Sequence, residues 1–198
     1  MADADRRVFL RETTVQEDFF RFVEHMGYDF VQSLGPEQGM PLQHTYRAVD
    51  GGATVRFLIE PIVHLPVLLL WGNLAEDVAK EASDYFDVVN RDDILSMYDP
   101  AEQSGQRRKA LAFLALLASD GRDQGVVAVL DQAARDRDVE VRLDAIWVMR
   151  YAPWPEVISI AERVRREDAE PRVREEAQSF LDGYEKMKRE GRLAGDVR

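Results

Sequence analysis

Hydrophobic and polar residues follow two different patterns along this chain, and the change between them divides it into two halves. Residues 6–12 form a short apolar run between charges, which is typical of a strand. Residues 13–32 repeat apolar side chains at helical spacing as far as Phe30, and Thr14-x-x-Glu17 is a capping-box pattern typical of a helix start. We therefore predict a strand followed by one helix whose apolar positions face a core.

The segment 42–60 predicts a β-hairpin. Its Asp-Gly-Gly sequence at 50–52 supplies residues that tolerate the positive φ angles of tight turns. After this turn, side chains alternate with the period of a half-buried strand. Pro61 and Pro66 bracket the next residues, so we expect another strand to begin near Val67 or to lie at an edge.

Helical spacing returns in residues 73–99, where Asn90 is suited to cap a shorter second helix. The first half is thus predicted to be an α+β unit over residues 1–100, with three to four strands and two or three helices. From residue 101 onward, strand patterns disappear from the sequence.

The second half contains an internal repeat. DRDVEVRLDA at 136–145 aligns with DAEPRVREEA at 168–177, and AEQSGQRRKA at 101–110 is a degenerate third copy. Each copy predicts the start of a helix, where acidic side chains cap free backbone amides. A second apolar helix is expected to follow the helix of each of the first two copies in chain order, at 123–136 and 154–167. Helix pairs of this kind bury their apolar faces only by stacking on their neighbours.

The same spacing recurs in the copies, so a physical role can be assigned to each position. Val141 and Val173 are expected in the core, one turn before a small alanine that lets the next helix approach. Arg142 and Arg174 lie four residues after an acid and within its reach. Stacking would also bring these arginines close to acids of the adjoining repeat.

This repeat resembles the HEAT-repeat family in its short bacterial form, which reads Asp-x-acid-Pro-x-Val-Arg-x-x-Ala. The resemblance covers about residues 101–190. It implies paired antiparallel helices with a concave surface for protein–protein contact, formed here by 123–135 and 155–167. The predicted fold class is an α+β N-terminal unit followed by an all-α HEAT-like solenoid of about two and a half repeats over 101–198. Residues 190–198 are expected to form a mobile tail.

Charge restricts the classes of partner. The net charge is −11, and residues 1–100 carry 18 acidic against 8 basic side chains. An acidic chain repels phosphate backbones, so no nucleic-acid partner is expected. The acids concentrated in 74–99 indicate a docking surface for a basic partner, a surface that imitates DNA, or a solvated helix surface that aids solubility.

Candidate chemistry is sparse. The chain has no cysteine, no Gly-x-Ser-x-Gly motif and no glycine-rich phosphate-binding loop. His44, His64 and Glu60 form a conceivable metal cluster, but their spacing is not that of a tight ligand set. The sequence therefore predicts no catalytic residue, no cofactor and no metal.

Some DNA glycosylases are built from HEAT-like repeats and use Trp and Asp on a basic concave surface. Trp147, Trp154 and Asp144 invite that comparison, but the required basic groove is not evident in the sequence. The simpler interpretation places Trp147 in the repeat core and Trp154 against a turn.

We expect a non-catalytic protein-binding module in the cytoplasm, acting as an adaptor, a regulator or an immunity-type protein. Its partner would be another protein, which could be a basic one. Self-association is a further possibility. An accessory or lyase-like helper that binds a small molecule between the domains is the alternative. No membrane association is expected, because the most apolar run, 61–72, is too short to span a bilayer. The candidate contact residues are Arg122, Asp123, Gln132, Arg135, Glu156, Glu162, Arg163, Arg166, Asp84, Asp87, Asp92 and Asp93.

Overall fold

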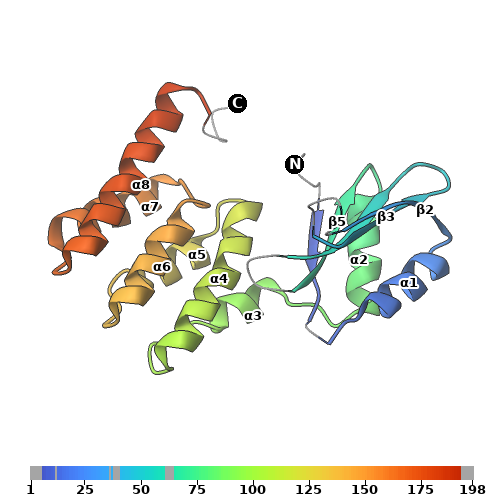
Figure 1. Ribbon diagram of the computed structural model, residues 1–198, viewed down its shortest axis with the longest axis horizontal. Helices are drawn as coiled ribbons and strands as arrows, with labels where there is room; N and C mark the ends of the chain where they lie inside the picture. The colour runs from blue at the N-terminus through green and yellow to red at the C-terminus, as the bar shows by residue number, and fades with distance from the viewer. Residues whose placement is uncertain (1–5, 12, 36, 38–40, 61–64, 193–198) are drawn as a thin grey trace. The chain divides into compact units, whose positions relative to one another are not determined.

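The structure is a computed structural model that describes residues 6–11, 13–35, 37, 41–60 and 65–192 (Figure 1). The chain divides into two compact units, residues 1–90 and residues 91–198. We call them the sheet unit and the helical unit and describe each by itself. No helix among the described residues is long and apolar enough to cross a membrane.

The sheet unit is a five-stranded antiparallel sheet with two helices, so its predicted α+β class is confirmed with one or two strands more than expected. In chain order its elements are β1 (Arg6–Phe9), α1 (Gln16–His25), β2 (Tyr28–Leu34), β3 (Gln43–Ala48), β4 (Thr54–Ile59), β5 (Pro66–Trp71) and α2 (Ala75–Tyr85). The strand order is β1-β5-β4-β3-β2, and each neighbouring pair is antiparallel.

One sheet face and the two helices share the core of the sheet unit. Strand side chains alternate between faces, so Phe57 of β4 and Leu68 of β5 point the same way at paired positions. Phe19 of α1 stacks on Phe57 with 5.0 Å between ring centroids. From α2, the buried Val78 joins the same cluster. Both helices therefore cover the same face.

The first predicted helix is too long. Helix α1 ends at His25, and Gly27 takes a positive φ of 65° that turns the chain into β2. Phe30, expected in a core, lies on β2 opposite Tyr46 and is 57% exposed. Pairing with β3 outweighs the helical periodicity, since it satisfies backbone groups on both sides of the irregularity between Phe30 and Gln32.

The start of α1 also differs from the prediction. The Asp18 carboxylate accepts a hydrogen bond from the Val15 amide at 3.2 Å, and Val15 is the N-cap residue. The expected pair Thr14 and Glu17 is therefore wrong by one residue, although an acid at the third helical position does cap the amide.

The hairpin prediction is confirmed. Strands β3 and β4 flank the turn, where Gly51 has a φ of 75° and the Asp50 carboxylate accepts from the Gly52 amide at 2.8 Å. Strand β5 begins at Pro66, one residue before the predicted start.

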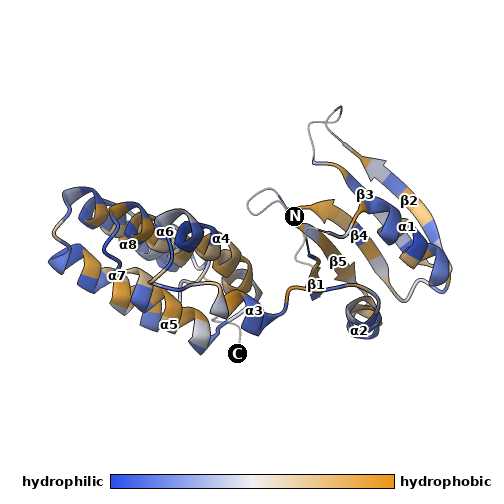
Figure 2. Cartoon of the chain, turned by 90° about the horizontal axis from the view of Figure 1, so that it is seen from below, coloured by the Kyte–Doolittle hydropathy of each residue, from blue (hydrophilic) through white to orange (hydrophobic). Residues whose placement is uncertain are grey.

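The helical unit consists of helices stacked in two layers. They are α3 (Arg91–Ser96), α4 (Ser104–Asp120), α5 (Gln124–Ala133), α6 (Val139–Met149), α7 (Pro155–Glu167) and α8 (Pro171–Arg189). Helices α4, α6 and α8 lie side by side in one layer, and α3, α5 and α7 in the other, with apolar and polar residues interspersed along each helix (Figure 2).

Contacts between the layers pair α3 with α4, α5 with α6, and α7 with α8. The sequence alignment had grouped them differently, with α4 before α5 and α6 before α7. The short helix α3 belongs with α4, so the unit boundary lies at Asn90/Arg91, ahead of the predicted border at residue 100.

Candidate functional site

One arginine occupies the same position in each repeat copy: Arg107 on α4, Arg142 on α6 and Arg174 on α8. Two of them hold the leading aspartate of the next copy. Arg107 donates from Nε and Nη2 to Asp136 at 2.8 and 2.9 Å, and Arg142 donates likewise to Asp168 at 2.8 and 3.0 Å. The expected link to an acid of the adjoining repeat is confirmed for Arg142, whereas the sequence had predicted it for Arg142 and Arg174 and not for Arg107. We call the Arg107–Asp136 and Arg142–Asp168 pairs the Arg–Asp ladder.

The ladder also fixes the loops that precede α6 and α8. Arg142 Nη1 donates to the carbonyl of Asp136 at 2.8 Å, and Arg174 Nη1 to the carbonyl of Asp168 at 2.7 Å. The same aspartates accept from the backbone amides of Asp138 and Glu170, at 2.8 and 2.9 Å. Each aspartate therefore connects an arginine of one repeat to the loop of the next. These hydrogen bonds hold the two loops in place.

The Asp136 rung is the most buried. Its side chain is 3% exposed and that of Arg107 is 1% exposed, and Tyr98 donates its hydroxyl to Asp136 at 2.6 Å. Burial alone would raise the pKa of Asp136, but hydrogen bonds from Tyr98, the Asp138 amide and Arg107 outweigh it and lower that pKa. Burial and the Asp136 carboxylate together raise the pKa of Tyr98. The site therefore keeps a carboxylate and a neutral phenol at neutral pH.

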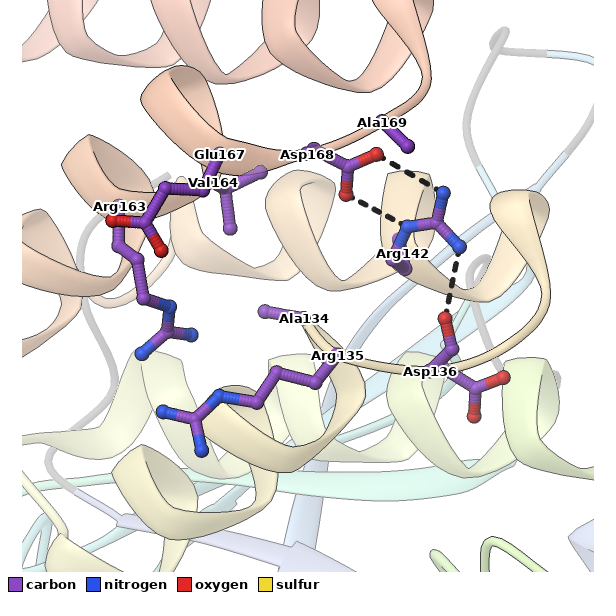
Figure 3. A pocket seen from close by; sticks show the side chains of 9 residues that line it. All are labelled: Ala134, Arg135, Asp136, Arg142, Arg163, Val164, Glu167, Asp168 and Ala169. Carbon is purple, nitrogen blue, oxygen red and sulfur yellow. Dashed lines mark hydrogen bonds and ion pairs between the residues drawn. The ribbon is translucent and has the colours of Figure 1, made fainter.

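Two adjoining hollows open beside this ladder. The Arg163 hollow has a volume of about 570 Å³ and lies between the ends of α5 and α7 (Figure 3). Its lining residues are Ala134, Arg135, Asp136, Arg142, Arg163, Val164, Glu167, Asp168 and Ala169. The Tyr98 hollow has a volume of about 530 Å³. Its lining residues are Tyr98, Pro100, Ala128, Asp131, Gln132, Arg135, Asp136 and Arg137. Because Arg135 and Asp136 line both, the two hollows adjoin each other, and together we call them the inter-repeat groove.

Four arginines, Arg135, Arg137, Arg142 and Arg163, line the groove. Arg163 Nη1 donates to Asp131 at 2.6 Å, and Arg135 Nη2 donates to the same carboxylate oxygen at 3.1 Å. Figure 3 shows the guanidinium groups of Arg135 and Arg163 near each other at one end of the hollow, with Arg142 engaged by Asp168 at the other. Two guanidinium groups therefore share one carboxylate.

The contact residues predicted on the α5–α7 layer lie at two opposite ends of it. At the end away from the groove, Arg122 pairs with Glu156, and Asp123 caps α5 while accepting from Arg91 Nη2 at 2.8 Å. The side-chain bond from Arg91 lowers the pKa of Asp123 against its partial burial.

The remaining predicted residues of this layer lie on or near the groove. Gln132, Arg135 and Arg163 line it. Glu162 and Arg166 are exposed on α7 but line neither hollow. A ten-residue helix spans about 15 Å, so the predicted set does not form one contiguous contact surface.

The predicted acidic residues divide between the two units. Asp84 is exposed on α2, and Asp87 follows that helix and pairs with Arg11 at 2.9 Å. Asp92 and Asp93 lie in the first turn of α3, where Asp92 pairs with Arg91 at 2.8 Å. Asp84 and Asp87 thus belong to the sheet unit, and Asp92 and Asp93 to the helical unit.

The residues that the sequence suggested for a glycosylase site or a metal site make contacts with neighbouring side chains. Trp147 is 36% exposed and meets Tyr151 edge-on at 5.1 Å, so its expected place in the core is wrong. Asp144 pairs with Arg108 at 2.6 Å. His44 Nδ1 lies 3.1 Å from the Ser33 hydroxyl, and burial lowers the pKa of His44.

Metal-binding geometry does not occur within the described ranges, where no group of three or more His, Asp or Glu side chains is suited to hold an ion. His64, which the sequence suggests as a partner for His44, lies outside the residues that the structure describes.

Comparison of the chain with family models, with curated proteins and with solved structures gave no match. The site must therefore be interpreted from its own geometry.

Sequence reasoning missed several groove residues, among them Asp131, Arg137, Glu167 and Ala169. One signal was available: Asp131 and Arg163 are 32 residues apart, the same offset as between the last two repeat copies. Offsets of one repeat bring side chains of neighbouring helices together, so a search for opposite charges at that distance finds this pair.

Proposed function

We propose that the helical unit is a short HEAT-like solenoid of three helix pairs. The repeated arginine, its hydrogen bonds to the next copy and the stacking of pairs in two layers support this proposal. Alanines at the aligned position, Ala110, Ala145 and Ala177, are all buried and permit close helix approach.

We further propose that the chain is a non-catalytic protein-binding module and that the inter-repeat groove is its contact surface. The observation that carries this proposal is that two open hollows share Arg135 and Asp136 and lie beside loops that hydrogen bonds of the ladder hold in place. A preorganised surface binds with less loss of conformational entropy than a mobile one. Arginine is also enriched where proteins contact one another.

The composition of the groove favours a protein partner over the alternatives. Pockets for small molecules are mostly apolar, whereas both hollows are lined largely by charged and polar side chains. A nucleic acid would meet a chain of net charge −11 and a groove whose ladder arginines are already bound to aspartates.

A second surface suits a basic partner. Asp77, Glu81 and Asp84 are exposed on α2, and no ion pair involves them within the described part of the chain. We propose that this surface assists association by long-range attraction, which raises the rate of encounter more than the affinity.

Affinity capture from a lysate of the source organism tests the groove directly. The substitution Ala169→Trp places a large side chain in the Arg163 hollow from an exposed loop position. Ala101→Trp makes the same change at an exposed position that lines neither hollow. A stoichiometric partner should be retained by the wild type and Ala101→Trp and lost by Ala169→Trp. Retention by all three proteins, or no partner on the wild type, would contradict the proposal.

A further inference from the structure

The Arg163 hollow contains unused hydrogen-bonding capacity. Arg163 gives only its Nη1 to Asp131, while its Nη2 is buried without a hydrogen-bond partner. A buried donor with no acceptor costs stability, and an incoming acceptor removes that cost. Arg135 is exposed beside it and gives only Nη2 to the same carboxylate.

The charges of the groove leave room for one more anion. Asp136 and Asp168 are held by the ladder arginines and are not available to other cations. Of the remaining lining residues, Arg135, Arg137 and Arg163 face two acids, Asp131 and Glu167. This leaves an excess of one positive charge among the residues that line the groove.

We propose that the inter-repeat groove binds a carboxylate group of its protein partner, an Asp or Glu side chain or a chain end, at Arg135 and Arg163. This assignment rests on the proposed protein-binding function and adds the chemistry that the partner must present. The carboxylate takes donors that Asp131 leaves free on Arg135 and Arg163, and the buried Arg163 Nη2 reaches it only if the Arg163 side chain rotates.

The chemistry distinguishes a carboxylate from other anions. Guanidinium groups bind carboxylates through parallel N–H···O bonds, and charge-assisted bonds of this kind are stronger than neutral ones. A carboxylate matches the single excess charge, whereas a phosphate group, which carries more than one negative charge at neutral pH, exceeds it. Glu167 borders the hollow and repels any anion there, so it limits the affinity.

The probe is a short fluorescein-labelled peptide of alternating glycine and glutamate, compared with a matched glycine–glutamine peptide. Fluorescence anisotropy with the full chain measures binding, and nitrogen-15 spectra of the arginine Nε–H groups locate it. We expect only the glutamate peptide to bind and to shift the Arg135 and Arg163 resonances. Equal binding of both peptides, or unchanged resonances at both arginines, would overturn the assignment without any substitution.

Three variants sharpen the test. Arg163→Gln should weaken binding of the glutamate peptide at least about tenfold, because it removes a charged donor from a partly buried site. Arg166→Gln, the matched control on the exposed side of the same helix, should change it less than about twofold, as expected for a screened surface charge. Glu167→Gln should strengthen it by about two- to fivefold, since it removes the repelling acid. If Arg163→Gln and Arg166→Gln weaken binding equally, the peptide is held by non-specific charge attraction, and the proposed carboxylate site is wrong.

Two further outcomes separate the proposals. If free glutarate displaces the peptide at equal carboxylate concentration, the hollow recognises small acids and the peptide assignment is wrong. If the glutamate peptide fails to bind while Ala169→Trp still abolishes capture of a partner, only the carboxylate assignment fails. If capture survives Ala169→Trp, the proposed groove function itself fails.

Discussion

The two units of this chain hold their charged pairs in opposite ways. In the sheet unit, aromatic side chains such as Phe19, Phe22 and Phe57 fill the core, and ion pairs such as Arg11–Asp87 stay at the surface. In the helical unit, the core is mainly aliphatic, and charged pairs lie buried where one repeat meets the next.

This difference shows where each unit obtains its specificity. A sheet is specified by strand register, because a slip of one residue moves every side chain to the other face. Stacked helices lack such a register, and apolar surfaces alone permit sliding. Buried ion pairs add little net stability but disfavour every arrangement that leaves them unpaired. The ladder therefore sets the spacing of the repeats and, with it, the shape of the groove.

The largest expected effect is the loss of the most buried rung. Asp136→Ala leaves Arg107 and Tyr98 without their shared acceptor and should lower the free energy of unfolding of the helical unit by about 3–5 kcal/mol. Urea unfolding in a Trp71→Phe background, where the fluorescence comes from Trp147 and Trp154 of the helical unit, measures it. The control Asp144→Ala breaks an exposed pair and should cost less than about 1 kcal/mol. Equal losses of stability in the two variants would show that the buried ladder pair contributes no more than an exposed ion pair.

The second rung should matter less. Asp168→Asn keeps the shape of the side chain but weakens two bonds from Arg142, and we expect a loss of about 1–3 kcal/mol. Tyr98 has no counterpart at this rung among the hydrogen bonds of Asp168 in the described chain. A loss larger than that of Asp136→Ala would contradict the ranking by burial.

A substitution in the aromatic core tests the stability of the sheet unit, where the two preceding variants test the helical unit. Phe57→Leu keeps an apolar side chain but removes the ring stacked on Phe19, so we expect a loss of about 1 kcal/mol, from the aromatic pair and imperfect packing. Hydrogen exchange measured by mass spectrometry should show faster exchange in the sheet unit only. Faster exchange in helices α4–α8 would mean that the units do not unfold independently.

Acidification should weaken the sheet unit through His44. Burial lowers the pKa of His44 in the folded chain, so its stabilising contribution is fully present above the unfolded value of about 6.5 and is lost as the pH falls through that value toward the folded pKa. The urea midpoint of the sheet unit should therefore drop between about pH 7.5 and about pH 5.5. His44→Gln should reduce this drop, whereas the exposed His25→Gln should leave it as in the wild type. An undiminished drop in His44→Gln would exclude His44 as its source.

The smallest effect is expected at the solvated ion pair Arg172–Glu140, which also joins neighbouring repeats. Both side chains are about half exposed or more. Glu140→Gln should change the free energy of unfolding by less than about 0.5 kcal/mol, because water and salt screen the pair. A loss comparable to that of Asp168→Asn would show that repeat spacing depends on surface pairs as well.

Local patterns allowed much of this fold to be predicted from sequence. The hairpin followed from Asp50 and Gly51, and the start of α8 from Pro171, because turn and cap residues act on the backbone next to them. The failure at Phe30 has the converse cause. A segment compatible with both helix and strand is decided by its pairing partner, here β3, which is remote in the sequence.

The candidate site was predictable only in part for the same reason. Arg135 and Arg163 were predicted as contact residues, but not their convergence on Asp131. The pairing of α3 with α4 was also not visible, since α3 is too short for a clear periodic signal and lacks the repeat motif.

By itself, the sequence determined the α+β class of the first unit, the hairpin, the repeat and the link from Arg142 to an acid of the next copy. These features depend on residues that are close in the chain or recur at a fixed offset. Only the tertiary structure decided where α1 ends, which helices pair, and that loops from different repeats enclose a groove with Arg163 only partly satisfied. Packing between distant segments controls these features, because burial and hydrogen-bond satisfaction depend on what surrounds a residue in space.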